Sequence, residues 1–152
     1  MISLTDVKKV VFSYKINLIE NINKVFTANI VPEPDMVLFE VHNIGYGAYD
    51  ISITPMSNGE EIGYNRIKNL LREVQFEIDL GQFLNQDNEN YRQDRKELNQ
   101  IAFNLIFPFF SECFDEAGQK PSCIQYYIRN HEADDVFNLQ NKTWVKIEDL
   151  YK

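Results

Sequence analysis

The hydrophobic positions at the start of the chain repeat with the spacing of a helix. Between Thr5 and Ala28 the apolar residues recur mainly at steps of three and four, which places them on one helical stripe. They are Val7, Val11, Tyr14, Leu18, Ile22, Val25 and Phe26. Ser3 or Thr5 can cap the first turn. The segment Val31-Pro32-Glu33-Pro34 ends the pattern, because each proline disfavours a helical conformation in the residue before it. The pattern predicts one long amphipathic helix.

An alternation of apolar and polar residues follows, which is typical of strands with one buried face. It runs through residues 36–42 and again through 49–53, with Gly45-Tyr46-Gly47 between them as a turn. This pattern predicts a β-hairpin. Glu40 and Asp50 could face each other across it as paired carboxylates, or lie on the solvated face of a half-buried sheet.

The middle of the chain is less clearly patterned. A polar loop opens at Ser57-Asn58-Gly59, and the amide-rich residues 82–90 form a second loop. Residues 65–80 fit a helix, a strand or both, because their apolar positions satisfy both periods. We favour a helix over about 65–73 that runs into a strand.

The most hydrophobic segment lies between Asp87 and Ala117. It carries two helical stripes, which together cover about two-thirds of a helix. The first is Leu98, Ile101, Ala102, Leu105, Phe109 and Cys113, and the second is Phe103, Phe107, Phe110 and Phe114. We expect a helix at the centre of the domain, or one that gives its second stripe to a partner. Pro108 should kink it, and Gly118 suits its C′ position.

The last third of the chain predicts strands. Residues 124–129 resemble a strand, and residues 136–139 and 143–147 resemble a closing hairpin around Gln140-Asn141-Lys142. No flexible linker or repeat divides the sequence. The pattern therefore predicts a single α+β domain over residues 1–152, with long helices packed on an antiparallel sheet.

Composition and charge narrow the possible functions. Hydrophobic residues make up 44 % of the chain and there are 20 aromatic residues, enough for one substantial core. The formal net charge of −8 argues against a nucleic-acid partner. We find no signal-peptide pattern and no apolar run long enough to span a membrane. We therefore expect a cytoplasmic protein in which Cys113 and Cys123 are two buried thiols.

No arrangement of residues predicts catalysis or a cofactor. There is no G-x-S-x-G elbow, and His42 has no second histidine at metal-ligand spacing. The Gly45-x-Gly47 pair leads into a strand and not into a helix, so it does not predict phosphate binding. A metal site at His131, Glu132, Asp134 and Asp135 is chemically possible, but an exposed acidic loop is the commoner arrangement. We expect a non-enzymatic protein without metal or cofactor.

The distribution of charge is the remaining signal. Residues 77–152 hold 14 acidic and 8 basic residues, whereas residues 1–76 hold 9 and 7. The predicted partner-binding residues are Asp115, Glu116, Tyr126, Glu132, Asp134, Asp135 and Trp144. Such a surface can serve solubility alone, or it can dock a basic protein partner, with charge speeding encounter and aromatic side chains anchoring the complex. Trp144 can instead belong to the core of the domain.

The chain resembles the small acidic immunity proteins of bacterial polymorphic toxins. The resemblance rests on its size, the long first helix, the hairpin Met36–Val41, the segment Phe109–Gly118, and Phe137-Asn138-Leu139 with Trp144-Val145. It implies stoichiometric binding to a cognate toxin and no catalysis, and it assigns no role to any single residue. The alternatives are a regulatory or housekeeping interaction domain, which could dimerise through the second Phe stripe, and an enzyme or small-ligand binder with a site of another kind.

Overall fold

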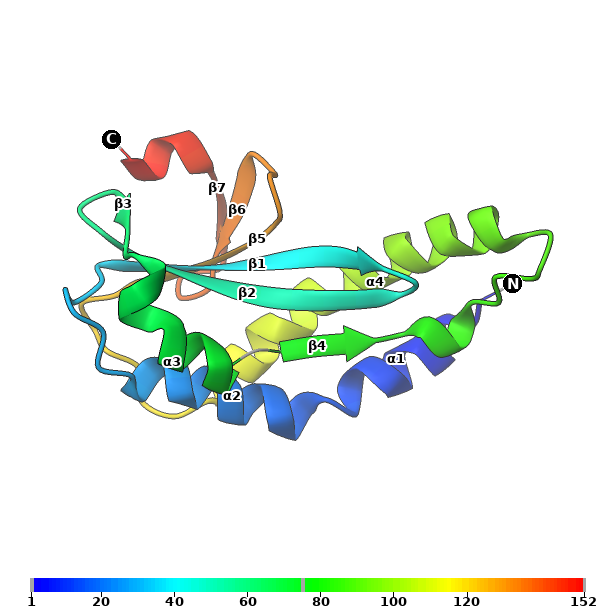
Figure 1. Cartoon of the computed structure of the whole chain (residues 1–152), viewed down its shortest axis with the longest axis horizontal. Coiled ribbons are helices and arrows are strands. Elements are labelled where there is room, and N and C mark those ends of the chain that lie inside the picture. Colours follow the sequence, from blue (N-terminus) through cyan, green and yellow to red (C-terminus); the bar gives the residue numbers. More distant parts are fainter. Residues whose placement is uncertain (1, 75, 152) are drawn as a thin grey trace.

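The computed structural model describes residues 2–74 and 76–151 and has an α+β fold, as the sequence predicts (Figure 1). The helices are α1 (Leu4–Phe12), α2 (Lys15–Thr27), α3 (Tyr64–Val74) and α4 (Tyr91–Glu116), with short 3-10 helices η1 (Gly81–Phe83) and η2 (Ile147–Tyr151). The strands are β1 (Met36–Gly45), β2 (Ala48–Ser57), β3 (Glu60–Glu61), β4 (Phe76–Asp79), β5 (Gln125–Asn130), β6 (Asp135–Asn138) and β7 (Thr143–Lys146).

Six of the seven strands follow the order β3-β2-β1-β5-β6-β7 in one sheet. The seventh, β4, pairs with the first half of β2, whereas β3 pairs with its last two residues. Both predicted hairpins, β1–β2 and β6–β7, are present and antiparallel. The prediction of an antiparallel sheet is wrong at one pair, because β1 and β5 run parallel. A parallel pair needs a long crossover connection, and the chain between β1 and β5 supplies one that includes α4.

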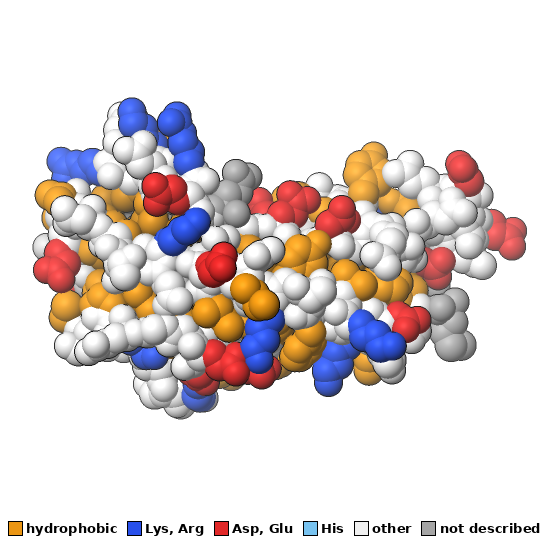
Figure 2. All heavy atoms as spheres, turned by 90° about the horizontal axis from the view of Figure 1, so that it is seen from below, with side chains coloured by type: hydrophobic (Ala, Val, Ile, Leu, Met, Phe, Trp, Pro, Cys, Tyr) orange, Lys and Arg blue, Asp and Glu red, His pale blue; other side chains and the backbone are white. Residues whose placement is uncertain are grey.

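All four helices contribute to one large hydrophobic core against one face of the sheet. Alternate residues of the central hairpin, such as Val37, Phe39 and Ile51, belong to this core together with buried residues of every helix. Figure 1 shows α1 and α2 end to end beneath the sheet. Figure 2 shows their outer side, where hydrophobic side chains lie between scattered acidic and basic groups.

The opposite face of the sheet is covered only in part. A second, smaller cluster of Met36, Leu38, Met56, Tyr127 and Val136 packs there against side chains of β7 and η2. Further along β1 the same face carries polar side chains instead. That polar half of the face is described below.

The predicted long N-terminal helix is two helices. Its stripe is correct, since Val7, Val11 and Leu18 are buried, but α1 ends at Phe12 and α2 begins at Lys15. At the break, the Tyr14 ring meets Phe76 edge-on at 5.9 Å between centroids, and its hydroxyl accepts a hydrogen bond from the Asp79 backbone N–H. Because these partners are remote in sequence, no local pattern marks the break. Ser3 caps α1 as expected.

Helix α4 is central, as predicted, and it ends directly before Ala117 and Gly118. Phe109, Phe110 and Phe114 are buried, whereas Phe103 and Phe107 are half-buried. Gly118 follows the C-cap Ala117 and so occupies the predicted C′ position, but it is not left-handed. Its N–H instead donates to Asn23 Oδ1 at 2.6 Å, and a Cβ there would lie 3.0 Å from the same oxygen. Gly118 therefore permits a close approach of α2.

Candidate functional site

The acidic residues predicted from the sequence all lie on the surface, and several are ion-paired. Asp115 lies 2.8 Å from Lys142 Nζ, Glu116 lies 2.8 Å from Lys15 Nζ, and Asp135 lies 2.6 Å from Lys146 Nζ. Each value is the distance between one carboxylate oxygen and the lysine nitrogen.

The paired carboxylates act on the pKa of their lysines. Hydrogen bonding to Asp135 raises the pKa of Lys146, and hydrogen bonding to Glu116 raises that of Lys15. Glu132 and Asp134 are also exposed. Because exposed ion pairs contribute little to stability, these carboxylates can exchange their lysines for groups on a partner.

Tyr126 does not belong to this surface, which corrects the sequence-based prediction. Its side chain is 0 % exposed. The ring lies 5.2 Å from that of Phe26 and 5.4 Å from that of Phe114. Tyr126 points from β5 to the helix-covered face of the sheet, so a partner cannot reach its ring without unfolding the core.

Trp144 is available as a surface anchor. It is 56 % exposed and rests on two other aromatic rings, Phe137 at 5.2 Å and Phe107 at 6.0 Å between centroids. Phe137 is its cross-strand neighbour on β6, and Phe107 comes from α4. Two neighbouring aromatic rings therefore support the indole on its inner side.

Two of the predicted acidic residues, Asp115 and Asp135, are ion-paired to the lysines two residues before and after Trp144. Asp135 pairs with Lys146, which is two residues beyond Trp144 on β7 and therefore on the same face of the strand. Lys142 Nζ ties the turn before β7 to Ser111 and Asp115 of α4. We call the group Trp144, Asp115 and Asp135 the Trp144 surface.

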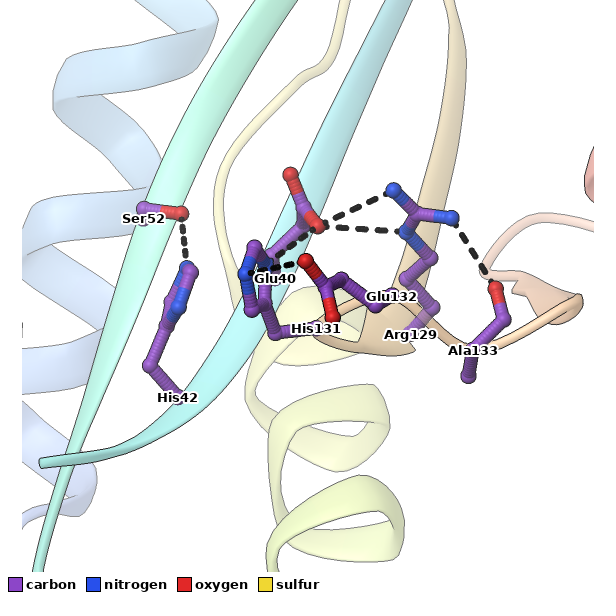
Figure 3. Close-up of polar contacts among 7 residues, drawn as sticks. All are labelled: Glu40, His42, Ser52, Arg129, His131, Glu132 and Ala133. Atoms are coloured by element: carbon purple, nitrogen blue, oxygen red, sulfur yellow. Dashed lines mark hydrogen bonds and ion pairs between the residues drawn. The ribbon is translucent and has the colours of Figure 1, made fainter.

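A second polar cluster lies on the open half of the sheet, and sequence reasoning did not find it (Figure 3). Its centre is Glu40 on β1, whose Oε2 accepts from Arg129 Nε at 3.2 Å and lies 3.1 Å from Arg129 Nη2. The two side chains are 12 % and 17 % exposed. Arg129 Nη1 also donates to the Ala133 carbonyl at 2.9 Å. Such a largely buried pair, in which one carboxylate oxygen meets two guanidinium nitrogens, restricts the position of both side chains.

Both histidines of the chain belong to the same cluster. The His131 ring lies 4.2 Å from the His42 ring between centroids, and its Nδ1 is 3.3 Å from Glu40 Oε2. His42 Nε2 is hydrogen-bonded to Ser52 Oγ on β2 at 2.9 Å. The strand register places Ser52 opposite Glu40, and Asp50 opposite His42. The expectation that Glu40 and Asp50 directly face each other is therefore wrong.

Ser52 and His42 have the distance of a nucleophile and its general base. A hydrolytic site also needs a group that orients the histidine, and among the described residues no carboxylate is hydrogen-bonded to His42. The carboxylate of Glu40 contacts Arg129 and His131 instead. The geometry therefore favours a structural role for the Ser52–His42 hydrogen bond.

We predict that a fluorophosphonate probe leaves Ser52 unmodified. Its hydroxyl has a base in His42, but among the described residues no carboxylate orients that histidine. Intact-protein mass spectrometry of the treated chain measures this directly. An adduct on Ser52 that disappears in a His42→Ala variant would establish a hydrolytic site and contradict the expectation of a non-enzymatic protein.

Other sequence-based expectations concern thiols, metals and membranes. Cys113 is buried as expected, but Cys123 is exposed, because it lies in the loop before β5. Within residues 2–74 and 76–151, no group of three or more His, Cys, Asp or Glu side chains is arranged to hold a metal ion. None of the helices described here combines the length and the hydrophobicity required to cross a bilayer. No protein-family model, curated protein or solved structure matches the chain.

Proposed function

We propose that the protein is a non-catalytic, cytoplasmic binding domain that docks on a basic protein partner, as an immunity protein covers the active site of a toxin. The observation that supports this most is Trp144, half-exposed on the rings of Phe107 and Phe137, with Asp115 and Asp135 ion-paired to the lysines two residues before and after it. Tryptophan is among the residues most enriched at the energetic centres of protein interfaces.

The Trp144 surface suits a docking role in two ways. The indole is already held by neighbouring rings, so binding would cost little side-chain entropy. The net charge of −8 would attract a basic partner from a distance and orient its approach. Charge would therefore act mainly on the rate of association, and burial of the indole mainly on the rate of dissociation.

The test begins with a partner captured from the native host on immobilised wild-type protein, followed by binding kinetics with purified components. We expect the combined Glu132→Gln, Asp134→Asn and Asp135→Asn variant to associate several-fold more slowly at low salt, and the difference should shrink as salt is added. We expect Trp144→Ala to dissociate about 30-fold faster, as for an anchor contributing about 2 kcal/mol.

Tyr64→Ala is the matched control, because Tyr64 is an exposed aromatic residue on α3. It should bind as the wild type does. Circular dichroism must show that Trp144→Ala remains folded. The proposal fails if the triple variant associates at the wild-type rate at low salt and Trp144→Ala dissociates no faster than Tyr64→Ala. A captured toxin domain would support the immunity role, whereas a housekeeping protein would support the regulatory alternative.

A further inference from the structure

A cleft of about 260 Å³ lies between α3 and the outer edge of β2. Residues 50–53 of β2 line it, and because consecutive side chains of a strand point to opposite faces, the cleft opens at the edge of the strand. Along this edge β4 pairs with residues 48–51 and β3 with residues 56–57. Among the described residues no strand pairs with residues 52–54 on this side, and the cleft lies at this gap.

The wall of the cleft exposes more apolar than polar surface. Ile51 and Ile53 contribute from β2, and Leu71 and Val74 contribute from α3. Ile51, Ile53 and Val74 also belong to the main core, so packing holds this wall in place. The volume is slightly below the range of about 300–1,000 Å³ that is usual for small-molecule sites. The cleft therefore suits the hydrocarbon part of a small ligand.

Two cations stand on the α3 side of the cleft. Lys68 and Arg72 both line it, and their spacing of four residues places them on one face of the helix. Both are exposed, and neither forms an ion pair with a described carboxylate. Like charges at this spacing repel each other and weaken a helix slightly. An anion bound between them would remove that repulsion.

The charge around the cleft is opposite in sign to that of the whole chain. Helix α3 holds the basic residues Arg66, Lys68 and Arg72 and the acidic residue Glu73, although the net charge of the chain is −8. Figure 2 shows basic side chains gathered over α3, at the upper left. Among the described residues, the lining holds two cations and one carboxylate, that of Asp50. The cleft would therefore attract an anion more than an amine.

We infer that this cleft binds a small carboxylic acid with an apolar body. The carboxylate would lie between Lys68 and Arg72, and the hydrocarbon part would lie against the apolar wall. A guanidinium suits this role because it can donate to both oxygens of one carboxylate. The cleft shares no residue with the Trp144 surface, so this binding function and the proposed protein docking can be tested separately.

Three probes with the same phenylpropyl body test the charge of the ligand: 3-phenylpropionate, 3-phenylpropanol and 3-phenylpropylamine. Each is titrated into the ¹⁵N-labelled full chain and followed through amide chemical shifts. We expect saturable shifts at Ile51, Ile53 and Leu71 with the acid. The alcohol should bind about threefold more weakly, as for one exposed ion pair lost, and the amine more weakly still. Absence of saturable shifts with the acid, or equal affinity for the acid and the alcohol, would overturn the inference.

Acetate tests the apolar wall, because it carries the same charge without the hydrocarbon body. It should bind much more weakly than 3-phenylpropionate, since it would bury almost no apolar surface. Equal affinities of acetate and 3-phenylpropionate would mean that the wall has no part in binding, and the inference would be wrong.

Two identical substitutions on α3 test the position of the charge. Arg72→Gln should weaken binding of 3-phenylpropionate about threefold, and adding Lys68→Gln should reduce the affinity to that of the alcohol. Arg66→Gln is the matched control, because Arg66 is an exposed cation of the same helix that is not among the lining residues. It should bind the acid as the wild type does. Equal affinities of the double variant and the wild type would contradict the role given to the two cations.

Added salt gives a readout that needs no variant. Lys68 and Arg72 are exposed, so sodium chloride should screen them and weaken binding of 3-phenylpropionate, whereas binding of the alcohol should not weaken. An affinity for the acid that does not fall as salt is added would mean that the apolar wall alone holds it, and this would contradict the inference.

Discussion

Replacing Phe114 with alanine is expected to lower the free energy of unfolding by about 3–5 kcal/mol. The ring is 0 % exposed and lies between Phe26, at 5.4 Å, and Tyr126, also at 5.4 Å between centroids. Its removal would leave a cavity where α2, α4 and β5 meet, and the three elements cannot close it without moving together. Urea denaturation followed by circular dichroism measures the loss.

Phe103→Ala is the matched control on the same helix. Phe103 is half-buried and meets Tyr49 edge-on at 5.6 Å between centroids, so we expect a smaller loss of about 1–2 kcal/mol. Equal losses at Phe114 and Phe103 would contradict this prediction. They would mean that the buried fraction of a side chain on α4 does not determine its contribution to the free energy of unfolding.

The sequence predicts the elements of this fold better than their arrangement. Both hairpins follow from alternation around marked turns, and α4 follows from its two apolar stripes, since these signals are local. The break between α1 and α2 was not predictable in this way. It occurs at Ser13 and Tyr14, without proline or glycine, and the contacts of Tyr14 there are with the distant residues Phe76 and Asp79.

The parallel pairing of β1 with β5 explains why the polar cluster was missed. Glu40-Val41-His42 and Arg129-Asn130-His131 each place a charged residue and a histidine on one face of a strand. That repeated spacing could have indicated a polar site. The four side chains form a cluster only because Glu40 and Arg129 are paired in the register of β1 and β5. Local pattern says nothing about which strands become neighbours after a long crossover.

The predicted partner surface also contains features that follow from local sequence and features that depend on long-range pairing. The acidic residues are exposed as expected, because charge is readable from the sequence. Trp144 is exposed as well, although the sequence alone also allowed a place for it in the core. Tyr126 and Tyr127 are adjacent, and only the pairing of β5 within the sheet decides which of them enters the main core. Cys123 was expected to be buried because of its residue type, yet it lies in an exposed loop. The sequence thus predicts the exposure of a residue well where its contacts come from segments close to it in the chain. It predicts exposure poorly where the contacts come from distant segments.

Arg129→Met is expected to lower the free energy of unfolding by about 3 kcal/mol, through the carboxylate that it leaves behind. Methionine keeps most of the apolar stem of arginine but removes both nitrogens that contact Glu40 Oε2 and the one that donates to the Ala133 carbonyl. Glu40 is only 12 % exposed, so its charge would remain largely desolvated, with His131 Nδ1 still 3.3 Å from its Oε2. Chemical denaturation at neutral pH measures the change.

The double variant Glu40→Leu with Arg129→Met decides whether the loss comes from the stranded charge. Replacing a buried ion pair with apolar residues of similar size is often close to neutral, whereas removing one member is costly. We therefore expect the double variant to regain most of the stability that Arg129→Met loses, even though it carries one more substitution. A double variant less stable than Arg129→Met would show that the pair stabilises the sheet directly. A loss below about 1 kcal/mol in Arg129→Met itself would mean that water reaches Glu40 and that the pair behaves as an exposed one.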